Sequence, residues 1–190
     1  KNNLIFDELE AFIYKDKNDK VFLVKNGTTR QIKKGLVPTI QAELKKGHYA
    51  CGYFSFEYNT NALVKVRSQV TPRLVYPNMR ATLYLNYVPV ENNLDSLLND
   101  AYKLPFKHIS KAESIPEKVF VNDQNKVYGT LFSVVGNAAS QHQFFLTDSL
   151  DHFLVGSLYF YARPNFDSIY PAAVYIQKDI VRLMETLKWK

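Results

Sequence analysis

The strongest alternation of apolar and polar positions lies between residues 127 and 161, where turn-forming residues separate three short apolar runs. Residues 127–135, 143–147 and 153–161 are rich in β-branched and aromatic side chains, which is typical of strands. They predict a three-stranded antiparallel meander. The third run is apolar on both faces, so its sheet should be covered on both sides. One face carries Phe153, Val155, Tyr159 and Tyr161, and the other carries Leu154, Leu158 and Phe160.

Two stretches carry apolar residues at helical spacing. One follows Asp167 and Ser168, which can cap a helix, and contains a proline in its first turn. The other follows Asn92 or Asn93 and should end at Pro105. Each predicts a helix with one packing stripe. The stripes consist of Ile176, Ile180, Leu183 and Leu187 in the first case, and of Leu94, Leu97, Leu98, Ala101 and Tyr102 in the second.

The rest of the chain predicts further strands and a division near residue 47. Residues 10–14, 20–25 and 28–32 are strand candidates, and Asn26-Gly27 favours a tight hairpin. A brief helix is predicted for residues 38–46, and further strands for residues 53–58, 63–66, 79–88 and 117–121, with the first two of these forming a hairpin. We therefore expect a basic N-terminal hairpin with a short helix over residues 1–47, which either packs on the core or stands apart, and a main domain over residues 48–190.

Two amphipathic helices and a mainly antiparallel sheet imply the α+β class. Because strands that are apolar on both faces need cover on both sides, we predict a three-layer α-β-α sandwich. The order of strands and long helices is PsbP-like by analogy, and this analogy carries no functional argument.

Composition agrees with a folded chain: 46% of the 190 residues are hydrophobic and 14% are aromatic, which is too apolar for disorder. The net charge is +6, of which residues 1–47 contribute +4, from ten basic and six acidic residues. The basic residues alternate with acids and with strand residues, so we interpret them as a solvated hairpin surface and expect no nucleic-acid partner.

Cys51 is the single cysteine, which rules out a disulfide within the chain. Because no hydrophobic segment precedes Cys51, it does not fit an acylated lipoprotein cysteine. No apolar run approaches the roughly 20 residues that a membrane-spanning helix needs.

Candidate chemistry concentrates between Ser140 and His152. His142 and His152 flank Asp148 and Ser149, but their spacing does not match paired metal ligands. Ser140, His142 and Asp148 could be combined into a hydrolytic triad, although Ser140 lacks a nucleophile elbow. Hydrogen bonding within the turn is the preferred interpretation, and we expect no metal, cofactor or enzymatic activity.

A second candidate site follows the helix that ends at Pro105. Lys107, His108 and Lys111 could hold a small anion, or a glycan together with the aromatic sheet edge. The alternative is a connector in which His108 satisfies a backbone group, and the sequence favours it.

Several motifs in one order resemble the gliding motility-associated lipoprotein D family (GldD). They are Gly136-Asn137-Ala138-Ala139-Ser140, Gln143-Phe144-Phe145-Leu146-Thr147-Asp148-Ser149, His152-Phe153-Leu154 and Glu185-Thr186-Leu187-Lys188-Trp189-Lys190. Upstream, Ser55-Phe56-Glu57-Tyr58, Asn92-Asn93-Leu94 and Phe106-Lys107-His108 extend the resemblance, which covers roughly residues 52–190.

The resemblance implies a cell-envelope lipoprotein that faces the periplasm, with its acylated cysteine upstream of Lys1. It also implies a non-enzymatic role beside other gliding motility and type IX secretion-associated envelope proteins. We expect a docking surface at two turns of the most family-like stretch, with candidate contacts at Asn137, Ser140, Asp148, Ser149 and His152. The alternatives are a small-anion or glycan-binding envelope module and a hydrolase that uses the Ser140-His142-Asp148 region.

Overall fold

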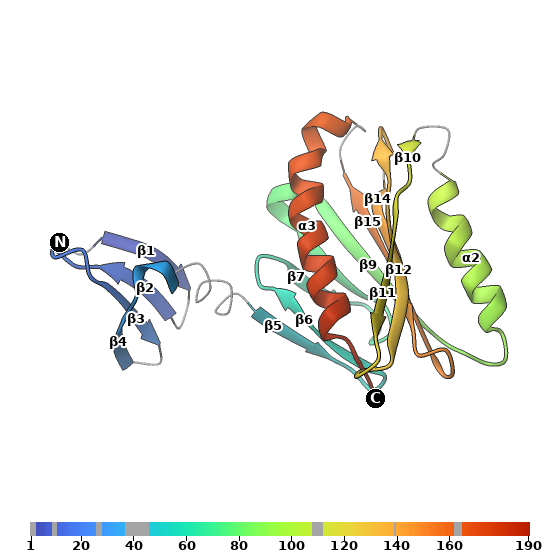
Figure 1. The fold of residues 1–190 in the computed structure, drawn as a ribbon, viewed down its shortest axis with the longest axis horizontal. Helices are drawn as coiled ribbons and strands as arrows, with labels where there is room; N and C mark the ends of the chain where they lie inside the picture. The colour runs from blue at the N-terminus through green and yellow to red at the C-terminus, as the bar shows by residue number, and fades with distance from the viewer. Residues whose placement is uncertain are drawn as a thin grey trace. The chain divides into compact units, whose positions relative to one another are not determined.

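The computed structural model describes residues 3–8, 11–25, 28–36, 46–107, 112–138, 140–161 and 165–190. The chain divides into two compact units, Lys1–Lys46 and Gly47–Lys190. Figure 1 labels the elements of both units.

The smaller unit is a four-stranded antiparallel sheet in the order β1-β2-β3-β4. The predicted strands are confirmed as β2 (Ala11–Lys15), β3 (Val21–Lys25) and β4 (Thr28–Ile32), while β1 (Asn3–Glu8) was not predicted. Ile13, Val21 and Leu23 form its small core, and a 3₁₀ turn, η1 (Lys34–Leu36), follows β4. The helix predicted for residues 38–46 lies outside the described residues, except that Lys46 begins a strand.

The larger unit is built on a seven-stranded sheet in which each strand is antiparallel to its neighbours. Its order is β11-β12-β14-β15-β9-β8-β7, with β15 paired to β9 along its whole length. The meander predicted for residues 127–161 is confirmed as β12, β14 and β15. The strands are β7 (Leu63–Val66), β8 (Pro72–Tyr76), β9 (Ala81–Pro89), β11 (Glu117–Asn122), β12 (Val127–Ser133), β14 (Ser140–Thr147) and β15 (His152–Phe160).

Shorter elements complete this unit. A 3₁₀ turn, η2 (Pro77–Met79), joins β8 to β9, and β10 (Ala112–Ser114) pairs with β13 (Val135–Gly136). A separate three-stranded sheet contains β5 (Lys46–Ala50), β6 (Phe54–Asn59) and β16 (Lys188–Trp189), in the order β16-β6-β5.

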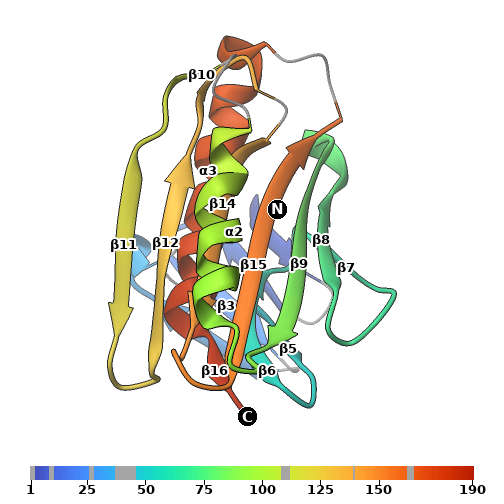
Figure 2. The ribbon, with the colours of Figure 1, turned by 90° about the vertical axis from the view of Figure 1, so that its right-hand side faces the viewer.

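Two long helices lie on opposite faces of the seven-stranded sheet. Helix α2 (Leu94–Phe106) covers one face over β14 and β15, and α3 (Phe166–Thr186) covers the other beside the three-stranded sheet (Figures 1 and 2). This arrangement confirms the α+β class and the three-layer α-β-α sandwich, whereas the PsbP-like analogy stays a prediction.

The main core lies under α3. The predicted stripe of Ile176, Ile180, Leu183 and Leu187 is confirmed, since none of the four is solvent-accessible. The stripe packs against the apolar face of the sheet that carries Leu154 and Leu158, together with aromatic residues of β6. The opposite face carries Phe132, Phe145 and Phe153 under α2.

Two sequence expectations about local structure are wrong. The predicted hairpin of residues 53–66 does not form, because β6 pairs with β16 while β7 pairs with β8 at the far edge of the large sheet. Helix α3 begins at Phe166, with Asn165 as its N-cap, and so starts two or three residues earlier than a cap at Asp167 or Ser168 would allow. Its first backbone N–H group, that of Phe166, donates to the side chain of Asn137 in the turn before β14.

Candidate functional site

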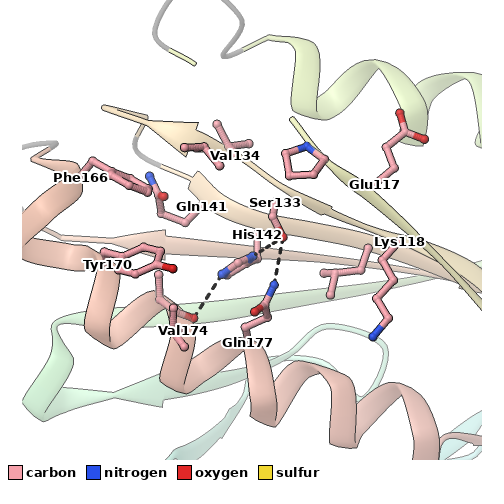
Figure 3. A pocket seen from close by; sticks show the side chains of 14 residues that line it. Glu117, Lys118, Ser133, Val134, Gln141, His142, Phe166, Tyr170, Val174 and Gln177 are labelled. Atoms are coloured by element: carbon pink, nitrogen blue, oxygen red, sulfur yellow. Dashed lines mark hydrogen bonds between the residues drawn. The ribbon is translucent and has the colours of Figure 1, made fainter. Parts of the chain in front are cut away.

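A cavity of about 330 Å³ lies where the first turns of α3 meet the edge of the large sheet, at β11, β12 and β14. Its lining surface is mostly apolar, and polar side chains from three elements converge on one wall (Figure 3). A mainly apolar cavity with a few convergent polar groups is the usual form of a small-ligand site. Glu117, Lys118, Gln141 and Tyr170 also border the cavity, but the polar side chains that bond to one another are Ser133, His142 and Gln177.

These three residues form a chain of hydrogen bonds that ends on α3. Gln177 Nε2 donates to Ser133 Oγ at 3.1 Å, and Ser133 Oγ lies 3.2 Å from His142 Nδ1. His142 Nε2 lies 3.2 Å from the carbonyl oxygen of Ala173. Because a carbonyl oxygen only accepts, the imidazole proton belongs on Nε2 and Nδ1 accepts the Ser133 hydroxyl proton. The chain therefore uses both ring nitrogens of a neutral histidine.

Burial makes this histidine a poor base. The imidazole is only 6% exposed, and desolvation lowers the pKa of His142 to about 4, although its hydrogen bond to Ala173 acts in the opposite direction. A general base works best when its pKa is near the operating pH, and no carboxylate orients this ring among its recorded hydrogen bonds. The arrangement suits fastening α3 to β12 and β14 better than activating Ser133.

The first family-like turn lies between β13 and β14. Asn137 and Ser140, which the sequence analysis predicted as partner contacts, make hydrogen bonds within the protein here. Asn137 is exposed, yet its Oδ1 accepts the backbone N–H of Phe166 at 2.8 Å and so caps α3 from outside the helix. Ser140 is fully buried, and its Oγ accepts a hydrogen bond from Gln143 at 3.2 Å. Gln141 donates to the carbonyls of Gly136 and Ala138. This turn therefore organises the start of α3.

The second family-like turn joins β14 to β15 and is built around Asp148. One carboxylate oxygen of Asp148 accepts the backbone N–H groups of Leu150, Asp151 and His152 at 2.9–3.0 Å. Partial burial alone would raise the pKa of Asp148, but these three donors and the neighbouring His152 lower it below its ordinary value. The turn is a rigid support for the exposed Ser149 and Leu150.

His152 belongs to a different environment from His142. Its ring stacks on Trp189 at a centroid distance of 5.1 Å, and its Nδ1 lies 2.9 Å from the Tyr87 hydroxyl. Trp189 in turn donates its indole N–H to the carbonyl of Lys126. His152 thus closes the end of the unit together with Trp189.

The proposed hydrolytic triad is not assembled. Ser140, His142 and Asp148 are each hydrogen-bonded to other groups: a glutamine side chain, the Ser133–Ala173 pair and backbone N–H groups, respectively. The serine that meets His142 is Ser133, nine residues before it on the neighbouring strand. The sequence analysis missed Ser133 and Gln177, and only the alternation of β12 and the register of β12 with β14 could have indicated Ser133.

The residues proposed for anion binding are only partly described. Lys107 follows the last turn of α2 and is exposed, while His108 and Lys111 lie outside the described residues. Within the described ranges no group of three or more metal-ligating side chains comes together. None of the described helices is both long enough and apolar enough to span a bilayer.

Comparison with known proteins gives one family. The family described as "Gliding motility lipoprotein GldD" matches residues 37–189, which is most of the chain and includes the whole large sheet, both long helices and the two turns. No curated protein matches the chain.

Proposed function

The chain belongs to the gliding motility lipoprotein GldD family, and from this membership we propose that it is a non-enzymatic docking component of the gliding machinery. In this proposal a lipid attached upstream of Lys1 anchors the protein, and the larger unit faces the periplasm. Its partners are other envelope proteins of gliding motility and type IX secretion.

The rigid Asp148 turn, with an exposed apolar residue at its tip, is the observation that carries the docking proposal. Leu150 is 67% exposed, although the three backbone hydrogen bonds to Asp148 hold the turn around it in one conformation. Presenting a large apolar side chain on a preorganised turn lowers the ordering cost of binding a partner. Ser149 lies beside it, and its backbone N–H donates to Thr147 Oγ1 at 2.9 Å, which also holds this part of the turn.

The two family-like turns do not support docking equally. Asn137 caps α3 and Ser140 is buried, so substitutions there would disturb the fold before they disturbed a partner. Asp148 itself shapes its turn through backbone bonds. We therefore propose that the contact centres on Ser149 and Leu150, with His152 and Trp189 as the supporting wall.

The alternatives have less support. A hydrolase would need Ser140, His142 and Asp148 in one site, and their hydrogen bonds separate them. A small-anion or glycan site at Lys107, His108 and Lys111 rests on a single described lysine. Nothing in the described part of the chain favours it over docking.

Leu150→Lys tests the proposal because it removes the exposed apolar tip without removing any recorded hydrogen bond of the turn. In a gliding bacterium whose only copy of the gene carries this change, we expect normal protein levels, weaker gliding and loss of cross-links between position 149 and envelope motility proteins. The matched control is Val66→Lys. Val66 is an apolar residue that is 52% exposed, and it lies on β7, the edge strand of the sheet far from this turn. Equal gliding and equal cross-linking in both variants would contradict docking at this turn.

A further inference from the structure

Strand β11 is the last strand of the large sheet, and no described strand pairs with its outer side. In the part of the chain that the structure describes, β12 is the only strand that pairs with β11. The backbone N–H of Ser133 donates to the carbonyl of Pro116, and the register is unbroken from Glu117 to Asn122. Backbone groups alternate in direction along an antiparallel pair. Lys118 and Phe120 therefore bond to β12, while Glu117, Val119 and Val121 direct their N–H and C=O groups outward.

The middle of this edge strand carries exposed apolar side chains, although open sheet edges usually carry features that prevent pairing with other chains. Val119 is 72% exposed and Val121 is 61% exposed, both on the face of the sheet that α2 covers further in. Native sheets usually shield an open edge with charges, proline or a bulge, because an unprotected edge pairs with other chains. Pro116, Glu117 and Lys118 protect the start of this edge, but the stretch from Val119 to Asn122 carries no charge, proline or bulge.

The other face of β11 borders two neighbouring cavities. Lys118 and Leu131 line both the 330 Å³ cavity and a second one of about 60 Å³, whose remaining walls include Phe120, Val181 and Met184. The two cavities follow the line between α3 and the edge strand. A strand added outside β11 would direct every second side chain toward this line.

We propose that the outer edge of β11 binds an extended segment of a partner protein as an eighth, antiparallel strand of the sheet. This inference rests on the proposed docking role and names a second surface and the kind of partner segment that fits it. Outward backbone groups supply the ladder, and exposed valines with the cavities on the reverse side supply side-chain contacts, which is how strand addition combines affinity with specificity.

The charges at one end of the edge define the segment more closely. Glu117 has the same alternation as the two valines and also borders the larger cavity, whereas Lys118 borders both cavities. A complementary antiparallel segment would place apolar residues opposite Val121, Phe120 and Val119, followed by an acid opposite Lys118 and a base opposite Glu117. A second copy of β11 cannot supply the acid opposite Lys118. If two copies pair through their outward backbone groups, the residue opposite Lys118 is Lys118, Phe120 or Asn122 of the other copy. The occupant is therefore a segment of different sequence.

Selection from displayed peptides with five randomised residues, carried out against the folded chain, tests the proposal. We expect enriched peptides with three apolar positions followed by an acid and a base, and binding that slows amide hydrogen exchange at Val119 and Val121. Val119→Pro removes an outward N–H group but no bond to β12, so the fold should persist while affinity falls at least about tenfold. The matched control Val119→Thr keeps the N–H group and the branched shape, and should lose less than about threefold.

A second measurement covers the case in which Val119→Pro does not fold. An enriched peptide that is N-methylated at the residue whose N–H group faces β11 should bind the wild-type chain at least about tenfold more weakly. If no enriched peptide depends on Val119, or if methylation is without effect, the strand-addition proposal is overturned. Concentration-dependent dimers that Val119→Pro dissociates would overturn it in favour of a second copy. Cross-linking at position 149 is independent of these outcomes, so the two proposals can fail separately.

Discussion

The two long helices cover opposite faces of one sheet, yet they are attached to it very differently. Helix α3 buries six residues completely or nearly so, namely Ile169, Ala173, Ile176, Ile180, Leu183 and Met184, whereas α2 buries only Ala101 and Pro105 to that degree. The apolar stripe of α2, at Leu94, Leu97 and Leu98, is only half-buried against Phe145 and Phe153.

Polar contacts follow the same division. Helix α3 holds the sheets through Tyr76 and Asp179, whose oxygens are 3.1 Å apart, and through an ion pair between Arg182 and Glu57 at 2.6 Å. Among the described residues, the polar side-chain contact between α2 and the sheet is the one between the Tyr102 and Thr130 hydroxyls, which lie 3.4 Å apart. Similar amphipathic patterns can thus belong to a central helix and to a lightly attached one.

The largest expected difference between the helices is in apolar packing. Leu183→Ala should lower the free energy of unfolding by about 2 to 5 kcal/mol, because a fully buried leucine leaves a cavity. Leu98→Ala on α2 should cost only about 1 kcal/mol, since its side chain is only partly buried. Urea denaturation of both variants measures the comparison. Equal losses would remove the distinction between the helices.

The polar chain under α3 predicts a pH effect. His142 has a folded pKa of about 4, below the ordinary 6.5, so the unfolded chain binds a proton first as the pH falls. Stability from this residue is complete above pH 6.5 and is lost between 6.5 and about 4, by about 3 kcal/mol in total.

Urea denaturation of the wild type and of His142→Gln across this pH range isolates the effect. The wild type should lose more stability than His142→Gln on acidification, while His48→Gln, a change at an exposed histidine, should behave as the wild type. Parallel pH profiles for the wild type and His142→Gln would mean that the ring is not held neutral by burial.

The smallest effect is expected on α2. Tyr102→Phe removes a long hydroxyl contact from a side chain that is 40% exposed, so unfolding free energy should change by less than about 0.5 kcal/mol. Thermal denaturation by circular dichroism is sufficient to measure it. A loss above about 1 kcal/mol would show that α2 depends on this bond more than its geometry indicates.

The sequence predicted the elements that have a strong local period and missed those fixed by distant partners. The stripe of α3 and the two faces of β15 follow from spacing alone. The false hairpin of residues 53–66 had suitable strands and a suitable turn, but β6 pairs with β16, more than a hundred residues later. No local signal marks that choice.

The same limit applies to the candidate site. Asn137 was interpreted as a contact residue because its turn is family-like, yet it caps a helix that begins 29 residues later. Ser133 and Gln177 carry no motif and become polar neighbours only through strand register and the position of α3. The need for glycine at position 156 could not be predicted from the sequence either. In the fold, the ring of Phe144 occupies the space that a Cβ atom would need.

The pairing of β16 with β6 has a consequence for the order in which the larger unit can assemble. Lys188 and Trp189 pair with Ser55 and Phe54, and Lys190 bonds to the backbone of Cys51 and Tyr53. Residues 51–55 therefore cannot complete their sheet until residues 188–190 have joined it. Contacts of such long sequence separation slow folding, because loop closure precedes the gain from packing. A chain truncated before Lys188 would lack the strand that pairs with β6, and we expect it to aggregate more readily than the full chain during refolding.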